Sequence, residues 1–255
     1  MKRLDPSVLN LVRSALDEDI GRGDVTSLAA LEPDLVKGVI VAKSEGVLSG
    51  LAPAIFSFQK VDSANKLTPL LNDGDRFRPG DTIIELEGLN QTLLTAERTA
   101  LNFLAHLSGV ATLTRRYVDE VSGTDCRILD TRKTTPGFRH LEKAAVQHGG
   151  GENHRFGLYD MVLIKDNHIA AAGSISAAVD RTRDWLASAD YRLQFNQPGE
   201  NIEIEVEIKS AEELTEAIKA GVKRLLLDNQ SLDSLRELVR LARRLNPDVK
   251  LEASG

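Results

Sequence analysis

The sequence predicts an α/β protein, with an α+β domain over residues 1–110 and an α/β barrel or doubly wound sheet over residues 111–255. Two observations predict this class. Residues 1–110 combine helical periodicity with short strand patterns that turn residues separate. After residue 126, short apolar runs alternate with helical patterns, which is typical of parallel strands joined by helical crossovers.

In the first domain, a helix is predicted from Pro6, which suits a first helical turn, up to Gly21, which ends it. Its apolar side chains recur at helical spacing at positions 9, 12, 16 and 20. Strands are predicted at residues 36–42 and 82–86. A long helix is predicted at residues 93–107, where apolar residues again recur at helical spacing.

In the second domain, five short strands are predicted, at residues 127–130, 161–164, 202–208, 225–227 and 249–251. Helices are predicted at residues 211–220 and 232–245, and residues 190–201 are predicted to be a surface loop without a function. Each strand ends in polar residues: residues 130–133, residues 165–168, Glu207, residues 228–229, and Ser254 with Gly255. Because the carboxyl ends of parallel strands line the ligand site in such folds, we expect these tips to carry function.

The composition narrows the class of protein. Of 255 residues, 42% are hydrophobic and 27% are charged, which is ordinary for a globular protein. The net charge of −6 disfavours nucleic-acid binding. No apolar run is long enough to span a membrane, and the acidic, amphipathic N-terminus is not a targeting peptide. The single cysteine favours a reducing compartment, and we therefore expect a cytoplasmic protein.

The segment 132–168 is a cationic island in this acidic chain. It holds six Lys/Arg against four Asp/Glu, and four of the five histidines. Adjacent Arg132 and Lys133 offer a planar fork and a point charge, which suit carboxylate and phosphate oxygens. The three glycines at 149–151 indicate either a close backbone approach or a flexible surface loop. The island predicts a small anionic ligand, and the alternative is chance clustering on a solvated face.

Two carboxylates on consecutive strands, Glu207 and Asp228, can hold Mg²⁺ or sugar hydroxyls, or stabilise an oxocarbenium-like transition state. Alternatively, the alternation of Glu203, Glu205 and Glu207 marks one solvated strand face. His154 lacks the spacing to other histidines that a zinc site requires.

Several long motifs resemble the quinolinate phosphoribosyltransferase family, the carboxylating nicotinate-nucleotide pyrophosphorylases. They are residues 15–26, 94–104, 130–137, 149–155, 157–160, 163–168, 205–207 and 227–229. The resemblance implies an N-terminal α/β sandwich, an incomplete α/β barrel and a homodimer. It also implies a reaction in which quinolinate and 5-phosphoribosyl diphosphate give nicotinate mononucleotide, diphosphate and CO₂, with Mg²⁺ as cofactor, in NAD synthesis.

The resemblance further implies roles for individual residues. Four would bind the substrate carboxylates: Arg132, His154, Arg155 and Lys165. Thr131 would bind substrate, and Lys133 would bind the phosphoribosyl diphosphate. Glu207 and Asp228 would serve the ribose hydroxyls and the metal, and Ser254 and Gly255 the 5-phosphate. The predicted catalytic residues are Lys133, Lys165, Glu207 and Asp228. Arg98 would reach into the partner subunit's site.

The chain departs from the family pattern at its end. The family continues beyond the Ser254-Gly255 pair with a helix and another strand, so we expect a C-terminal truncation and an incomplete 5-phosphate site. Three alternatives stay open: a phosphoribosyltransferase acting on another base without decarboxylation, the relative associated with molybdate transport, and an inactive metabolite-binding homologue.

Overall fold

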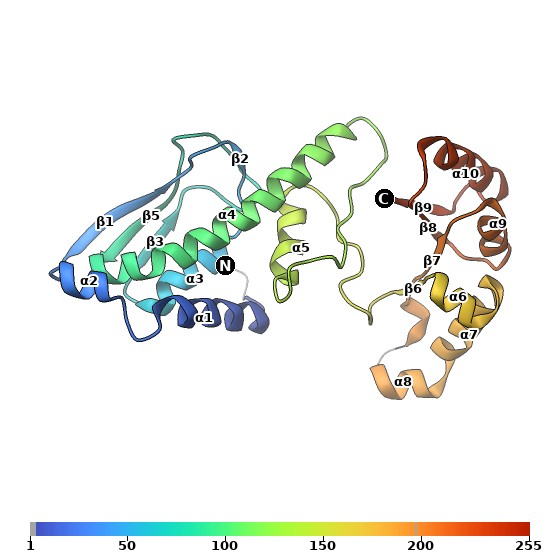
Figure 1. The fold of residues 1–255 in the computed structure, drawn as a ribbon, viewed down its shortest axis with the longest axis horizontal. Coiled ribbons are helices and arrows are strands. Elements are labelled where there is room, and N and C mark those ends of the chain that lie inside the picture. The colour runs from blue at the N-terminus through green and yellow to red at the C-terminus, as the bar shows by residue number, and fades with distance from the viewer. Residues whose placement is uncertain (1–3, 197) are drawn as a thin grey trace. The chain divides into compact units, whose positions relative to one another are not determined.

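The structure is a computed structural model that describes residues 4–196 and 198–255. Its contacts divide the chain into two compact units, Met1–His154 and Arg155–Gly255 (Figure 1). The first unit combines helices with antiparallel strands, and the second alternates helices with parallel strands.

The first helix of the first unit, α1 (Pro6–Ile20), is bounded as the sequence predicts. The Asp5 carboxylate accepts a hydrogen bond from the Ser7 backbone N–H at 2.8 Å, and Pro6 occupies the first turn. The helix ends at Gly21, whose φ of 53° lies in a region that favours glycine.

An antiparallel sheet with the order β1-β5-β3 forms one layer of the first unit. Its strands are β1 (Leu35–Val41), β5 (Thr82–Leu89) and β3 (Lys66–Pro69), and β2 (Gly46–Val47) pairs separately with β4 (Arg76–Phe77). The second layer is α3 (Leu51–Val61) and α4 (Asn90–Glu120), whose apolar faces share a core with the sheet. The predicted N-terminal α+β sandwich is therefore present, with strands close to those predicted.

The helix predicted at residues 93–107 is the central part of α4, which continues to Glu120. Buried residues recur along α4 as far as Thr114, and they belong to two separate cores. Around Phe103, Leu107 and Ala111, α4 shares a second core with α1 and with α5 (Arg139–His148). The short α2 (Val25–Ala30) also packs against α4.

The second unit is a four-stranded parallel sheet in the consecutive order β6-β7-β8-β9. The strands are β6 (Val162–Ile164), β7 (Ile204–Ile208), β8 (Arg224–Asp228) and β9 (Lys250–Ser254). One sheet face packs on the helices α6 (Asp166–Ala172), α7 (Ile175–Ala187), α9 (Ala211–Lys219) and α10 (Leu232–Leu245). Consecutive parallel strands with helical crossovers confirm the predicted α/β class for this part of the chain.

Two predicted elements differ from the structure. Residues 127–130 form no strand, only an isolated parallel bridge between Leu129 and Glu152. The predicted loop at 190–201 contains α8 (Ala189–Phe195) and a short 3₁₀ helix, Gly199–Asn201, while its residue 197 lies outside the described residues. The helix α8 was not predicted, because few apolar residues mark it in the sequence. It is held by aromatic contacts: Tyr191 stacks on Phe195 and contacts Trp185 of α7.

The domain boundary proposed at residue 110 falls within α4. The contacts divide the chain into units after His154, because α5 packs on α4 and on α1, and the predicted domain boundary at residue 110 stays a prediction. The helix α5 therefore belongs to the compact first unit.

Candidate active site

The turn that carries Arg132 is built by local hydrogen bonds. The Thr131 hydroxyl accepts from the Lys133 backbone N–H at 2.9 Å, and the Arg139 guanidinium donates to the Arg132 carbonyl at 3.4 Å and to the Thr134 hydroxyl at 3.3 Å. Arg132 itself is half-buried, and its buried Nε has no hydrogen-bond acceptor within residues 4–196 and 198–255. Since buried donors are almost always paired, this one is a candidate ligand contact.

A buried ion pair underlies this turn. Lys143 on α5 donates to the carboxylate of Asp130 and to the carbonyl of His154, at 3.0 Å for the latter. The same Asp130 oxygen accepts from the His154 backbone N–H at 2.9 Å. Burial raises the pKa of the Asp130 carboxyl, and the Lys143 ammonium opposes that shift. The sequence analysis gave neither residue a role, although a lysine among the apolar positions of a helix was a usable signal.

The three consecutive glycines belong to a tightly packed segment, not to a flexible loop. A Cβ on Gly149 would lie 2.5 Å from the Ala111 carbonyl oxygen of α4, and one on Gly151 would lie 3.1 Å from the Ile128 carbonyl oxygen. Gly150 has a φ of 89°, which side chains rarely adopt. Of the two readings of this motif, the close backbone approach is correct.

We expect Gly149→Ala to lower the free energy of unfolding by about 1–3 kcal/mol, because the new methyl group overlaps backbone that cannot move aside. Urea denaturation measures this change. Gly109→Ala is the matched control. Gly109 lies on α4, the helix that Gly149 contacts, and a Cβ at Gly109 meets no atom within 4 Å. That variant should be neutral or slightly stabilised. Equal stability of the two variants would contradict the packing argument.

Most histidines of the cationic island make structural contacts. His148 Nδ1 lies 2.8 Å from the Ser49 hydroxyl, and His168 Nδ1 accepts from the Lys165 backbone N–H at 2.9 Å, which caps α6. His140 lies 3.9 Å from the Asp5 carboxylate. Only His154 of the four was assigned to a ligand, and the structure holds its backbone through the buried ion pair.

The second unit presents its polar side chains on the sheet face opposite the helices. Glu205 pairs in register with Arg224, and Glu207 pairs with Leu226, two residues before Asp228. Because side chains alternate along a strand, Glu205, Glu207 and Asp228 point to the same face. Glu205 is fully buried and Glu207 is 7% exposed, so the solvated-face interpretation of the glutamate alternation is wrong.

The ion pairs of Arg224 separate Glu203 and Glu205 from Glu207. Its guanidinium lies 3.0 Å from a carboxylate oxygen of Glu203 and 3.3 Å from one of Glu205. Both glutamates are therefore neutralised toward the amino ends of the strands. Glu207, nearest the carboxyl end of β7, pairs instead with Lys165 at 3.0 Å.

The carboxyl ends of β6 to β9 bring several predicted site residues together. Lys165 at the end of β6 contacts Glu207, and at the end of β8 the Asp228 carboxylate accepts from the Ser254 hydroxyl at 2.9 Å. Asp228 and Ser254 pair in register, and Gly255 follows directly. This edge of the sheet thus carries a cation, two carboxylates and a hydroxyl donor.

A further ion pair at this edge was missed by the sequence analysis. Lys209, after β7, donates to the Asp166 carboxylate at 2.8 Å. This hydrogen bond raises the pKa of Lys209 and lowers the pKa of Asp166, so both groups stay ionised near neutral pH. No period-2 or helical pattern in the sequence links Lys209 with Asp166, the first residue of α6.

Arg155 contacts the chain just before β6 in the second unit. Its guanidinium donates to the Met161 carbonyl at 3.3 Å, and Lys165 follows that strand. The assignment of both residues to substrate carboxylates stays a prediction.

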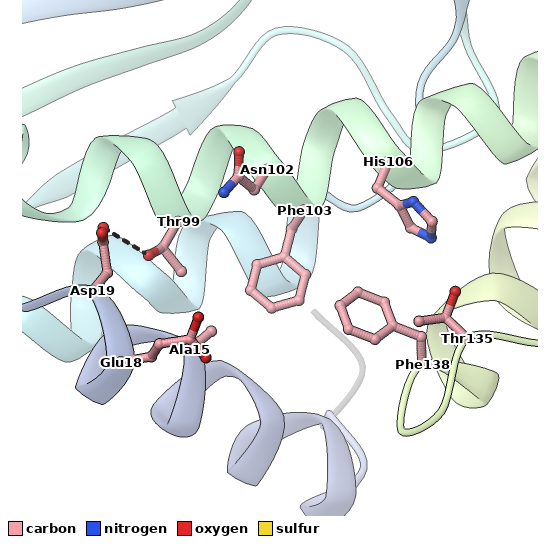
Figure 2. A pocket seen from close by; sticks show the side chains of 9 residues that line it. All are labelled: Ala15, Glu18, Asp19, Thr99, Asn102, Phe103, His106, Thr135 and Phe138. Carbon is pink, nitrogen blue, oxygen red and sulfur yellow. Dashed lines mark hydrogen bonds between the residues drawn. The ribbon is translucent and has the colours of Figure 1, made fainter.

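Arg98 lies exposed on α4, and within residues 4–196 and 198–255 no side chain forms a hydrogen bond or ion pair with it. Beside it, α1, α4 and residues 135–138 enclose a pocket of about 390 Å³ (Figure 2). The rings of Phe103 and Phe138 stack in it at 5.8 Å, and Glu18 and Asp19 lie on the α1 side. Of the described residues that line this pocket, none is a predicted site residue.

Two protein-family models match the chain, one over each part of it. The model for the quinolinate phosphoribosyl transferase N-terminal domain matches residues 24–108, and the model for the C-terminal domain matches residues 110–255. The chain belongs to the quinolinate phosphoribosyltransferase family. This confirms the resemblance that the motifs predict.

Individual relatives agree with this family assignment. The chain is 43% identical over 238 residues to a probable nicotinate-nucleotide pyrophosphorylase [carboxylating] of Bacillus subtilis, which covers 93% of this chain and 77% of the relative. It is 38% identical to a decarboxylating quinolinate phosphoribosyltransferase of Nicotiana tabacum, covering 96% and 71%. The crystal structure of NadC from Streptococcus pyogenes superposes with a TM-score of 0.86 at 37% identity, covering 100% of this chain and 86% of that one.

A search of the described helices finds none with the length and apolar character needed to cross a membrane.

Proposed function

We propose that this quinolinate phosphoribosyltransferase family member transfers the phosphoribosyl group of 5-phosphoribosyl diphosphate to quinolinate. Decarboxylation then gives nicotinate mononucleotide, diphosphate and CO₂. The observation that carries the proposal is the arrangement of Lys165, Glu207, Asp228 and Ser254 at the carboxyl edge of one parallel sheet. The single cysteine, exposed and free, is compatible with a cytoplasmic location.

The substrates explain the need for cations. Quinolinate carries two carboxylates, and the second substrate carries a diphosphate and a phosphate. We assign the carboxylates to Arg132, His154, Arg155 and Lys165. The buried Nε of Arg132 has no acceptor among the described residues, and this supports its assignment, because a bound carboxylate would supply the missing acceptor. Lys133, beside Thr131, is assigned to the phosphoribosyl diphosphate.

Glu207 and Asp228 are assigned to the ribose and to Mg²⁺, and the donor set fits this metal. Each has one carboxylate oxygen engaged, with Lys165 and with Ser254 respectively. Neither second oxygen has a hydrogen-bond partner within the described residues 4–196 and 198–255. Mg²⁺ prefers carboxylate oxygens, and it would neutralise charge on the diphosphate. Ser254 and Gly255 are assigned to the 5-phosphate.

These residues act by positioning and by charge. As diphosphate leaves, positive charge builds on the ribose, and the nearby carboxylates stabilise it. Lys165 pairs with Glu207 at 3.0 Å and is also assigned to a substrate carboxylate. The cations then hold the ring while the bond to CO₂ breaks. The electron pair of that bond stays on the ring carbon, where the adjacent positively charged ribosylated nitrogen stabilises it, and a proton from water then completes nicotinate mononucleotide. Most of the rate would come from orientation and electrostatics.

We also propose a homodimer in which Arg98 enters the partner's active site. Exposed apolar side chains lie on α4 and on α2, which packs against α4: Leu94 lies one turn before Arg98, and Val25 and Leu28 lie on α2. These three side chains are 49%, 77% and 66% exposed. Exposed apolar surface that is contiguous is typical of an interface. Arg98 has no hydrogen-bond or ion-pair partner within residues 4–196 and 198–255, and this together with the exposed apolar side chains supports the proposal.

The function is tested by supplying each candidate base with 5-phosphoribosyl diphosphate and Mg²⁺ and following nucleotide formation. We expect product from quinolinate and none from nicotinate. Product from nicotinate would support the alternative phosphoribosyltransferase that acts without decarboxylation. Absence of product with any base would support an inactive homologue.

For the two carboxylates, we expect Glu207→Gln and Asp228→Asn each to lower kcat about 10²-fold. The KM for quinolinate should change little, because the interaction strengthens only as ribose charge develops. Steady-state kinetics with each substrate varied in turn measure both quantities. Large losses of quinolinate binding with unchanged turnover would show that these residues serve the other substrate.

A further inference from the structure

We infer that the buried pair Asp130–Lys143 positions His154 for substrate binding. The geometry of the inference comes from hydrogen bonds within the first unit. Its kinetic test rests on the proposed function. Neither residue touches substrate in the proposed reaction, so both are positioning residues.

The pair holds both backbone polar groups of His154. Asp130 Oδ1 accepts from the His154 N–H at 2.9 Å, and Lys143 Nζ donates to the His154 carbonyl at 3.0 Å. With its amide nitrogen turned toward them, Asn153 donates to Asp130 Oδ2 at 2.6 Å and to the Lys143 carbonyl at 3.0 Å. Two successive residues are thus fixed by one ion pair.

The same pair joins two segments that the proposed function uses. Asp130 directly precedes Thr131, Arg132 and Lys133, and its backbone N–H donates to the Glu152 carbonyl at 3.1 Å. The side chain of Asp130 therefore connects the turn of Arg132 with the segment of His154. Lys143 reaches both from α5, which is anchored in the core by Leu141 and Ala145.

Stability alone does not explain why this ion pair is buried. Lys143 is 2% exposed and Asp130 is 9% exposed. Removing two charges from water is costly, and apolar residues of similar volume often replace such pairs without loss of stability. A pair whose two side chains each hydrogen-bond to the backbone of one proposed ligand residue has a reason to be kept that stability does not supply.

The test separates positioning from stability with three variants. Lys143→Met leaves Asp130 buried without its cation, so we expect a lower Tm and a higher KM for quinolinate. The double variant Asp130→Leu/Lys143→Met removes both charges, so we expect Tm to return toward wild type. In the double variant the KM for quinolinate should stay raised by about tenfold or more, with a smaller change in kcat. Arg76→Met, which breaks an exposed ion pair with Asp119, is the control and should change neither quantity.

Hydrogen exchange at the His154 amide gives a readout that needs no turnover. It should quicken about tenfold in the double variant while amides of the α4 core keep their protection. A stable double variant with wild-type KM and unchanged His154 exchange would show that the pair is purely structural. If the wild-type protein does not turn over quinolinate, the proposed function fails, but the exchange rates still decide whether the pair holds His154. If the double variant does not fold, the pair is required for stability, and the inference is overturned.

Discussion

Arg132→Ala should lower kcat/KM for quinolinate by roughly 30–1,000-fold, which corresponds to ~2–4 kcal/mol. The loss is large because the guanidinium is half-buried and its Nε lacks an acceptor in the described chain, so that a substrate carboxylate would complete it. The fold should survive, since the turn is held by Thr131 and Arg139 through backbone contacts that the substitution keeps. Steady-state kinetics and a Tm measurement check both statements.

Arg127→Ala is the matched control, since Arg127 is an exposed arginine five residues away that pairs with Glu152 at 2.7 Å. It should retain wild-type kinetics. Arg155→Ala should fall in the same range as Arg132→Ala, with some loss of Tm because Arg155 also donates to the Met161 carbonyl. If Arg132→Ala keeps wild-type kinetics, Arg132 does not bind the substrate and its assignment is wrong.

Mixing two inactive variants should restore activity if Arg98 is shared between subunits. In a mixed dimer of Arg98→Ala and Lys133→Ala chains, one site carries both lesions and the other carries neither. We therefore expect up to about half of wild-type activity per mixed dimer, starting from almost none. The exposure of Arg98, and the lack of an intrachain partner for it among the described residues, favour this outcome over a helical surface charge.

A second mixture provides the control. Dimers of Arg132→Ala and Lys133→Ala chains place one lesion in every site, because both residues lie on one turn, and they should stay inactive. Failure of the Arg98 mixture to recover, with heterodimers demonstrated, would exclude Arg98 from the partner's site.

Much of the fold could be predicted because local signals agreed with the final packing. Asp5, Pro6 and Gly21 bound α1 by capping chemistry, and the apolar or alternating runs of β6, β7 and β8 mark parallel strands. The run at 127–130 has the same composition, yet it forms only a bridge, because its neighbour is the crowded glycine segment and not another strand. Composition alone does not contain that difference.

The site was predicted in part for a similar reason. Lys165 follows β6 and Glu207 lies near the carboxyl end of the neighbouring β7, so their meeting at 3.0 Å follows from the fold. Strand periodicity could not separate Glu207 from Glu205 and Glu203, since all three share a face, and only the position of Arg224 separates them. The Asp130–Lys143 pair was missed because a helix and a turn must fold together before the two residues meet.

The most direct test of the proposed function uses quinolinate labelled in the carboxyl group next to the ring nitrogen, the group that decarboxylation removes. With 5-phosphoribosyl diphosphate and Mg²⁺ present, the account predicts release of the label as CO₂ in equal amount to the nicotinate mononucleotide formed, and no release without 5-phosphoribosyl diphosphate. A nucleotide product that retains the label, or no product at all, would contradict it.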